Sequence, residues 1–552
     1  MNVAEAVGTA LARLGVRQVF GVVGSGNYHL TNALVAAGAR YVATRHEGGA
    51  ATMADAFVGM SGQLAAVSVH QGCGLTNAMT GVAEAAKSRT PLLVLAAEAT
   101  QPGSNFFVDQ PALAAAVGAV SVRIDSAEGC LDQVLAAVVC ALFERRTVLV
   151  NLPLDVQASP VPDAVVERLA ALTVPAAPTP PEPEPADIAT LADLLSAARR
   201  PVLLAGRGAL SAQAELLALA DASGALLATS AVAKGLFRDS PWSLDISGGF
   251  ATPLAARLIR DADVVVAFGC ALNMWTTRHG TLIGPQTTVV QVDHDAAAIG
   301  RHHPVQHSVI ADSAASAAAV TEHLARRKAR LDGYRSPQLS AAIAAESRWR
   351  DVPYEDWGTD GDDARIDPRT LSILLDDALP TERVVAVDSG NFMGYPSMFL
   401  SVPDAGGFCF TQSFQSIGLG LATAIGAALA RPDRLTVAAL GDGGALMAAA
   451  ELDTVRRLGL PMVVVVYNDS AYGAEVHHFT DGDPHGTVTF PETDLAAIGA
   501  GYGFDAVTVR RAADLAGVHD WLAGSRGRPL LVDAKVASPR GSWWLEEAFR
   551  GH

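Results

Sequence analysis

Short, continuous apolar runs alternate along the whole chain with longer segments of helical periodicity. The runs expected to be strands are QVFGVVG (18–24), YVATR (41–45), LAAVSVH (64–70), PLLVLAA (91–97), TVLVNLP (147–153), PVLLAG (201–206), VVVAFG (264–269), TVVQVD (288–293), RVVAVDSG (383–390), LTVAALGDG (435–443), PMVVVVYND (461–469) and PLLVDAKV (529–536). Valine-rich strands separated by helices are typical of parallel sheets that are covered on both faces. The pattern therefore predicts an α/β protein built from doubly wound parallel sheets.

Two polar stretches divide this pattern into three segments. VPAAPTPPEPEPA (174–186) is proline-rich and is expected to be an extended linker. A second boundary is expected near 330–366, in a polar stretch that ends in DWGTDGDDARIDP. We therefore expect three domains, at about 1–170, 187–330 and 367–552, in agreement with a typical domain size of roughly 100–200 residues.

The amino-acid composition excludes some classes of binding partner for this protein. The chain has 552 residues, and its 40 basic and 57 acidic residues give a formal net charge of 40 − 57 = −17. This balance argues against nucleic acid or an anionic membrane surface as the main partner. The five cysteines include no CxxC pair, and we see no signal peptide and no apolar run near the roughly 20 residues of a membrane span. We expect a cytoplasmic protein with reduced thiols.

Two acidic side chains follow neighbouring apolar runs in the third segment. Asp442 follows LTVAAL, and Asp469 follows PMVVVVY. If these runs are parallel strands joined by one helix over 445–458, both acids emerge at the same carboxyl edge of a sheet, where ligands bind. Two carboxylates there repel each other unless a cation intervenes, and Mg²⁺ shares oxygen ligands with substrate phosphates. The spacing predicts a magnesium-bridged diphosphate; the alternative is an ordinary turn with solvated acids.

The motifs resemble those of the thiamine diphosphate-dependent enzymes. GDGG followed 27 residues later by YND resembles their diphosphate motif, RHEGGAA (45–51) resembles their RHE-x-x-A-A pattern, and GCGLTNAMTGVAEAA (72–86) resembles their G-x-G-x-x-N-x-x-T-G segment. The first-segment match is similar to the branch of acetolactate synthase, benzaldehyde lyase and 2-oxo acid decarboxylases. The resemblance covers essentially the whole chain.

This resemblance implies an order of domains and an assembly. The order is an aminopyrimidine domain, a central Rossmann-like domain and a diphosphate domain. In this family the cofactor lies between the first domain of one subunit and the third domain of another, which implies a homodimer or homotetramer with active sites at the subunit interface.

The resemblance also implies which residues hold the cofactor and its metal. Asp442, Asp469 and the Ala471 carbonyl correspond to Mg²⁺ ligands, although Asp469 stands where the common pattern has Asn and adds negative charge. The Gln415 carbonyl would accept from the 4′-amino group, and Ile417 would support the bent cofactor unless it is a plain core residue. The other expected cofactor-binding residues are Ser389, Gly390, Asn391, Gly441, Gly443, Gly444 and Tyr472.

Catalytic candidates come from two further stretches. Glu47 would hydrogen-bond to N1′ of the aminopyrimidine, a role that needs a buried and mostly protonated carboxyl group; in isolation it reads as a first-turn helix Glu. His70 and Gln71 end a strand, where His70 would orient a 2-oxo acid or move protons, or would only hydrogen-bond within its loop. Glu475 and His478, three residues apart, would face the cofactor with His477 turned away, or would form a solvated helix start.

The implied reaction is decarboxylation of a 2-oxo acid, carboligation, or both, through an enamine intermediate, by a lyase or transferase. The alternatives are a 2-hydroxyacyl-CoA or 2-hydroxyketone lyase, with RRKAR (326–330) as a candidate CoA site, an FAD-containing oxidase or synthase, a non-catalytic cofactor-binding paralogue, and a magnesium-dependent nucleotide enzyme. FAD is not supported, since the turn in LLAGRGALSA (203–212) is explained equally well by helix–strand packing. NFMGY (391–395) stands where acetolactate synthases usually carry Met-Trp, which argues against a true acetolactate synthase.

Overall fold

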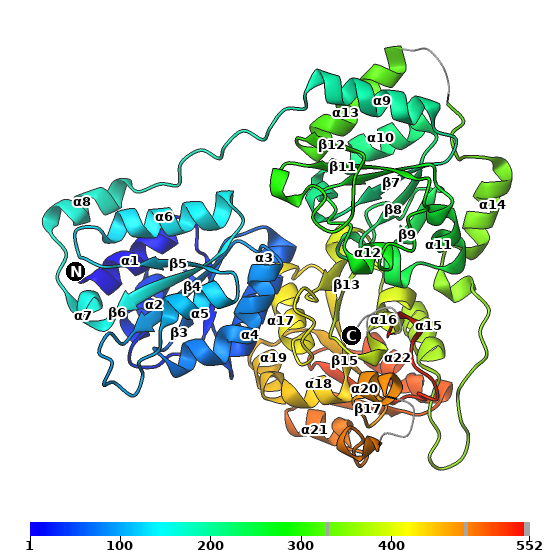
Figure 1. Ribbon diagram of the computed structural model, residues 1–552. Helices are drawn as coiled ribbons and strands as arrows, with labels where there is room; N and C mark the ends of the chain where they lie inside the picture. The colour runs from blue at the N-terminus through cyan, green and yellow to red at the C-terminus, as the bar shows by residue number, and fades with distance from the viewer. Residues whose placement is uncertain (327–330, 480–483, 546–552) are drawn as a thin grey trace.

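The computed structural model describes residues 1–326, 331–479 and 484–545. They form three α/β domains, each around one six-stranded sheet in which every neighbouring pair of strands is parallel (Figure 1). Helices cover both faces of each sheet. The predicted fold class is confirmed.

The first sheet has the order β2-β1-β3-β4-β6-β5. Its strands are β1 (Gln18–Gly21), β2 (Arg40–Ala43), β3 (Ala65–Val69), β4 (Leu92–Glu98), β5 (Val120–Arg123) and β6 (Thr147–Pro153). The flanking helices are α1 (Val3–Arg13), α2 (Tyr28–Ala36), α3 (Glu47–Ser61), α4 (Cys73–Lys87), α5 (Gln110–Ala116), α6 (Cys130–Phe143), α7 (Leu154–Ala158) and α8 (Asp163–Ala171). The carboxyl ends of β2 and β3 lead into α3 and α4, which places Glu47 and His70 at one edge of this sheet.

The second sheet has the order β12-β11-β10-β7-β8-β9 and is reached through an extended segment between α8 and α9 (Figure 1). Its strands are β7 (Pro201–Ala205), β8 (Leu226–Thr229), β9 (Ser243–Ile246), β10 (Val264–Phe268), β11 (Thr288–Asp293) and β12 (His307–Ile310). Its helices are α9 (Pro185–Ala197), α10 (Gln213–Ser223), α11 (Pro253–Arg260), α12 (Met274–Thr277), α13 (Ser313–Arg326) and α14 (Pro337–Glu346).

The third sheet repeats the strand pattern of the first, in the order β14-β13-β15-β16-β18-β17. Its strands are β13 (Arg383–Val387), β14 (Phe408–Phe410), β15 (Leu435–Gly441), β16 (Met462–Asn468), β17 (Asp505–Val509) and β18 (Leu530–Lys535). Its helices are α15 (Pro368–Ala378), α16 (Gly394–Phe399), α17 (Gly420–Ala430), α18 (Asp442–Met447), α19 (Leu452–Leu458), α20 (Gly473–His478), α21 (Leu495–Gly501) and α22 (Ala516–Ala523).

The prediction of one continuous helix over 445–458 is wrong. The segment instead contains α18, a short 3-10 turn η8 (Ala449–Glu451) and α19. The turn directs the buried carboxylate of Glu451 at backbone amides of Arg45 and His46 in the first domain. A contact between residues about 400 positions apart along the chain is invisible to local periodicity.

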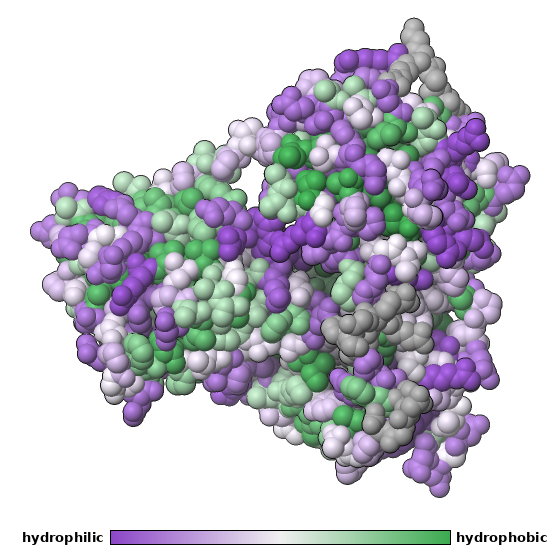
Figure 2. Space-filling view, in the orientation of Figure 1, coloured by the Kyte–Doolittle hydropathy of each residue, from purple (hydrophilic) through white to green (hydrophobic). Residues whose placement is uncertain are grey.

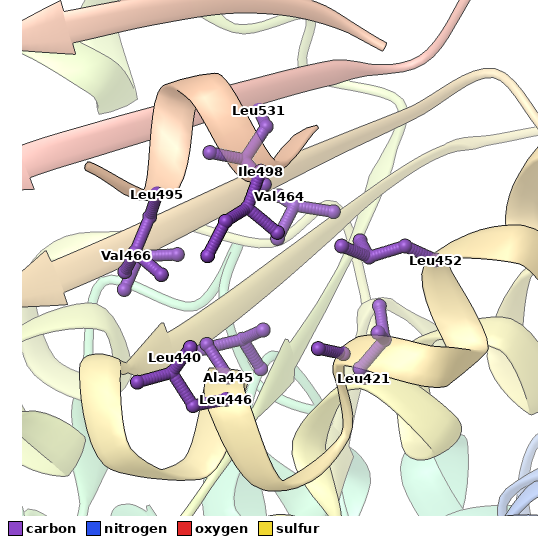
Figure 3. Close-up of a pocket in the computed structure, with 11 residues that line it drawn as sticks. Leu421, Leu440, Ala445, Leu446, Leu452, Val464, Val466, Leu495, Ile498 and Leu531 are labelled. Atoms are coloured by element: carbon purple, nitrogen blue, oxygen red, sulfur yellow. The ribbon is translucent and has the colours of Figure 1, made fainter. Parts of the chain in front are cut away.

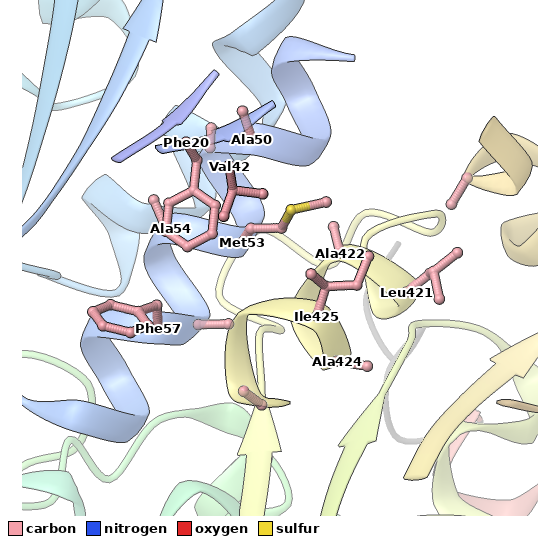
Figure 4. Close-up of a cluster of buried hydrophobic side chains, with 14 of the residues drawn as sticks. Phe20, Val42, Ala50, Met53, Ala54, Phe57, Leu421, Ala422, Ala424 and Ile425 are labelled. Carbon is pink, nitrogen blue, oxygen red and sulfur yellow. The ribbon is translucent and has the colours of Figure 1, made fainter. Parts of the chain in front are cut away.

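The first and third domains share one hydrophobic core. Helices α3 and α17 pack against each other, with Met53 of α3 pointing towards Ala422 and Ile425 of α17 (Figure 4). Both helices are rich in alanine and glycine, so their backbones approach closely. At Gly426 a Cβ atom would lie 2.2 Å from the Met53 carbonyl oxygen.

Replacing Gly426 with alanine is expected to destabilise the protein by about 1–3 kcal/mol, because the added methyl group pushes α17 away from the backbone of α3. The measurement is the free energy of unfolding in urea. Gly59→Ala is the matched control: Gly59 lies in α3 with nothing within 4 Å of its would-be Cβ, so alanine there is expected to add about 0.5–1 kcal/mol of stability. Equal effects of the two variants would contradict the proposed close approach.

Candidate active site

Asp442 and Asp469 meet at the carboxyl edge of the third sheet, as their spacing predicted. Strands β15 and β16 are adjacent and parallel, Asp442 begins α18, and Asp469 directly follows β16. Burial, and next the charge of Asp469, raises the pKa of Asp442 to about 7. Burial raises the pKa of Asp469 to about 6, although a hydrogen bond from Ser538 opposes this rise. Asp442 is buried and Asp469 is half-buried, and two neighbouring acids of this kind are suited to hold a divalent cation between them.

The glycines beside Asp442 are required by close contacts. A Cβ atom on Gly444 would lie 2.2 Å from Oδ2 of Asp388, and one on Gly443 would lie 2.6 Å from the Tyr472 ring. Backbone without side chains therefore lines this edge, and an anionic group can approach its amides.

Asp388, which sequence reasoning missed, joins two of the expected cofactor loops. Its fully buried carboxylate accepts hydrogen bonds from the backbone amides of Ser389 (2.9 Å), Gly418 (3.0 Å) and Leu419 (3.2 Å). Burial raises its pKa to about 6, against the opposing effect of these amides. Asp388 thereby ties the loop 389–391 to the loop that carries Gln415 and Ile417. The signal was present, since Asp388 is a third acid directly after a central strand.

The chain segment after β18 packs over the acid pair and was also missed. The Ser538 hydroxyl lies 3.2 Å from Asn391 Nδ2 and 2.9 Å from His477 Nε2. The Ser542 hydroxyl donates to the Asn391 carbonyl (2.7 Å). His477 thus contacts this side of the site, whereas the helical spacing predicted that it would turn away. Glu475 and His478 lie in the same short helix α20, half-buried.

Glu47 stands at the corresponding edge of the first sheet, as the first residue of α3. It is 9% exposed, and Oε2 accepts a hydrogen bond from Asn77 Nδ2 (3.1 Å). His46 caps the helix, since its Nδ1 accepts from the Gly48 amide (3.0 Å). The carboxyl group is thus both buried and oriented, and its catalytic role stays a prediction.

His70 and Gln71 face a loop that carries a serine which sequence reasoning missed. Ser25 Oγ lies 3.4 Å from His70 Nε2, and His70 Nδ1 lies 3.0 Å from the Gln71 carbonyl. Because a carbonyl only accepts, Nδ1 carries the hydrogen and Nε2 of the neutral ring is left as the acceptor. Gly24 and Gly26 allow this contact, since Cβ atoms there would collide with His70 and Gln71. The two glycines around Ser25 were the available sequence signal.

The two groups of residues lie in different domains. In the part of the chain that the structure describes, no hydrogen bond or ion pair joins Glu47 or His70 to Asp442 or Asp469. Third-domain residues that contact the turn before Glu47 include Glu451, which accepts from the Arg45 and His46 amides, and Asp453, which pairs with the Arg45 side chain (2.6 Å).

A small pocket in the third domain lies apart from this chemistry. Its lining is entirely apolar and comes from β15, β16, β18 and the helices around them (Figure 3): Leu421, Leu440, Ala445, Leu446, Ala449, Leu452, Val464, Val466, Leu495, Ile498 and Leu531. Because no lining residue carries a titratable group, we read it as imperfect core packing.

The two candidate binding stretches of the middle domain are explained by ordinary packing and surface contacts, as far as the structure describes them. At Gly206 a Cβ atom would lie 2.2 Å from the Gly269 carbonyl oxygen, so packing alone accounts for the glycine-rich turn. In the RRKAR stretch, Arg326 pairs with Glu322 one helical turn earlier (2.7 Å), and residues 327–330 lie outside the described part. No helix in the described residues is long and apolar enough to span a membrane.

Three family models match the chain in order. They are described as the N-terminal TPP binding domain (residues 1–117), the central domain (188–320) and the C-terminal TPP binding domain (388–534) of thiamine pyrophosphate enzymes. The chain belongs to the thiamine pyrophosphate enzyme family. The family suggested by the motifs is therefore confirmed, and with it thiamine diphosphate as the expected cofactor.

Curated relatives span almost the whole chain at modest identity. A probable 2-ketoarginine decarboxylase of Pseudomonas aeruginosa is 29% identical, over 93% of this chain and 90% of its own. A sulfoacetaldehyde acetyltransferase of Castellaniella defragrans is 26% identical, over 93% and 89%. A probable acetolactate synthase large subunit of Methanocaldococcus jannaschii is 27% identical, over 86% and 81%.

A solved structure shares the fold. The thiamine diphosphate-dependent 4-hydroxybenzoylformate decarboxylase of Rhodococcus jostii RHA1 superimposes with a TM-score of 0.80 at 22% identity, covering 97% of this chain and 99% of its own.

The residues present fit the cofactor of this thiamine pyrophosphate enzyme. The acid pair supplies the oxygen ligands that Mg²⁺ prefers. Gly443 and Gly444 add no side chains of their own beside that pair, and a buried, oriented carboxyl group is present in Glu47.

Proposed function

We propose that this protein is a thiamine diphosphate- and Mg²⁺-dependent lyase or transferase that decarboxylates a 2-oxo acid. The observation that carries the proposal is that Asp442, which is buried, and Asp469, which is half-buried, stand together at the ends of the adjacent strands β15 and β16, and that the pKa values of both are raised. A bound cation would offset the cost of placing two acids side by side at this edge.

Each group of residues has a role in this proposal. Asp442, Asp469 and the Ala471 carbonyl would hold Mg²⁺, and the backbone of Gly441, Gly443, Gly444 and Ser389–Asn391 would surround the diphosphate. Gln415 and Ile417 would contact the aminopyrimidine ring, and Tyr472 would close the side of the metal site next to Gly443. When bound, the cofactor supplies a nucleophilic carbon and an electron sink for the carboxyl electrons.

The remaining polar residues would hold and move protons. Glu47 would hold a proton at its carboxyl group against N1′. His70 Nε2, the acceptor side of the ring, would orient the substrate or exchange a proton with it, with Ser25 alongside. Gln71, Glu475 and His478 are the other groups that we assign to the substrate side.

A second copy of the chain is the proposed source of the missing half of each site. Apolar side chains beside both halves are exposed: Phe106 packs on His70 and is 43% exposed, while Phe414 and Met447 beside the Gln415 loop are 44% and 58% exposed. Pale green surface is visible around α4 in Figure 2, beside the third domain. Exposed apolar patches of this kind mark interfaces, which supports a homodimer or homotetramer.

The names of the relatives include a 2-oxo acid decarboxylase as well as enzymes named for other reactions. Some are named decarboxylases and others acetyltransferases or acetolactate synthases. We therefore place decarboxylation first and leave protonation or ligation of the product to the experiment.

The test is titration of the apo-protein with thiamine diphosphate and Mg²⁺, followed by tryptophan fluorescence, and then carbon dioxide release from a panel of 2-oxo acids. The proposal expects saturable, Mg²⁺-dependent binding and at least one donor that is turned over. Cofactor binding without turnover of any 2-oxo acid would redirect the assignment to hydroxyketone or acyl-CoA cleavage. Failure to bind the cofactor would overturn it.

A further inference from the structure

A third-domain carboxylate holds the backbone directly before Glu47. Oε1 of Glu451 accepts hydrogen bonds from the amides of Arg45 (2.9 Å) and His46 (3.0 Å), while Oε2 accepts from the Thr454 hydroxyl (2.6 Å). Glu451 is only 3% exposed. Gly49 leaves room for it, since a Cβ atom there would lie 2.7 Å from Oε1.

A first-domain carboxylate holds the backbone directly before Gln415 in the same way. Oε1 of Glu84 accepts from the Ser413 amide (2.8 Å), and Oε2 accepts from the Phe414 amide (2.6 Å). Glu84 lies in α4 and is fully buried. Ser88 reinforces the contact, because its hydroxyl lies 2.8 Å from the Ser413 hydroxyl and 3.2 Å from Glu84 Oε1.

These two contacts are reciprocal. Each carboxylate crosses between the first and third domains, and each binds two consecutive backbone amides that end one residue before a predicted aminopyrimidine contact. A buried carboxylate is costly unless it is hydrogen-bonded, and amide–carboxylate bonds are among the stronger hydrogen bonds in proteins. The contacts therefore fix the backbone beside Glu47 and the backbone beside Gln415, which belong to two different cofactor sites of the proposed assembly.

The backbone conformation of Gln415 explains why the neighbouring amides need to be held in place. Its φ of +61° lies in the left-handed region, which side chains other than glycine seldom adopt. A loop in this state relaxes when its neighbours are released. The amides of Ser413 and Phe414, held by Glu84, are the first-domain restraint on that loop.

We propose that Glu84 and Glu451 are positioning residues of the proposed cofactor sites: Glu84 sets the place of the Gln415 carbonyl, and Glu451 sets the place of the Glu47 carboxyl group. The proposal rests on the proposed function. It goes beyond interdomain attachment, which the apolar packing of α3 on α17 already provides.

The test compares Glu84→Ala and the milder Glu84→Gln with wild type, and Glu451→Gln in parallel. Glu167→Gln is the control, since Glu167 is exposed on α8. The first readout is amide hydrogen exchange of the apo-protein, which needs no cofactor. Glu84 variants are expected to speed exchange in the peptide that contains residues 413–414, and Glu451→Gln in the peptide that contains residues 45–46, by about tenfold for a lost hydrogen bond of typical strength.

The second readout separates positioning from attachment. In the donor assay, Glu84→Ala is expected to lower kcat by about tenfold or more with little change in the KM of the 2-oxo acid, as for an interaction that acts on the reacting geometry. Glu84→Gln keeps one acceptor oxygen and the side-chain volume, so it is expected to recover part of the loss.

Three experimental outcomes decide whether Glu84 and Glu451 are positioning residues. Faster exchange together with lower kcat supports the inference. Variants that match wild type in kcat and in cofactor affinity would overturn it while leaving the proposed function intact. A wild-type protein that binds no thiamine diphosphate would overturn the proposed function, and this inference with it.

Discussion

Glu47→Gln is expected to bind thiamine diphosphate nearly as tightly as wild type but to release carbon dioxide at least about 100-fold more slowly, the lower end of the usual contribution of a positioned acid–base group. Glutamine has the same shape and can still meet the Asn77 side chain that now donates to Glu47. It cannot hold an acidic proton. The change should therefore appear in kcat and leave the dissociation constant of the cofactor within a few-fold.

The two quantities come from separate measurements on one preparation. Fluorescence titration reports cofactor affinity, and carbon dioxide release under saturating cofactor reports kcat. Glu167→Gln, the exposed control, should match wild type in both. Full turnover by Glu47→Gln would remove Glu47 from the proposed catalytic role.

Asp442→Ala is expected to weaken Mg²⁺-dependent cofactor binding by at least about 100-fold, because it removes a charged oxygen ligand from a buried site. Asp469→Asn makes a sharp comparison. The amide keeps an oxygen at the same place and restores the residue common in the family pattern. It also removes the charge that raises the pKa of Asp442, so binding should persist.

Titration of each variant with thiamine diphosphate in Mg²⁺ and in EDTA measures this contrast. The difference between Asp442→Ala and wild type should vanish in EDTA. Equal loss in the two variants would mean that charge at Asp469 is itself required, and unchanged affinity in Asp442→Ala would remove the acid pair from the metal site.

Apart from β2, the predicted strands are interior ones, and those that the sequence pattern missed lie mainly at sheet edges. Strands β10, β15 and β16 are buried on both faces, so they read as continuous valine-rich runs. Strands β5, β9, β12, β14 and β17 lie at the edges of the three sheets, and β5 and β17 alternate between partly buried and exposed positions. Such short alternating segments resemble loops until a neighbouring strand is known.

The residues of the candidate site also fall into two groups, those that the sequence identified and those that only the structure revealed. Glu47, Asp442 and Asp469 were identified because each is an acid at a strand end within a short recognisable motif, a local pattern. Asp388, Ser538, Glu84 and Glu451 were missed, because their roles are to bind backbone or polar groups from distant segments. The assignment of all these residues to cofactor or metal stays a prediction, as do the domain boundaries and a cytoplasmic location.

The sequence by itself determined the α/β class, the family and the strand ends from which the chemistry emerges, because these depend on hydrophobic period and on motifs of a few neighbouring residues. Only the tertiary structure decided how the first and third domains meet. Their contact rests on glycine backbones in close approach and on carboxylates that bind amides more than 300 residues away. Any residue other than proline has an amide to offer, so such bonds leave no mark in the sequence of the segment that is held.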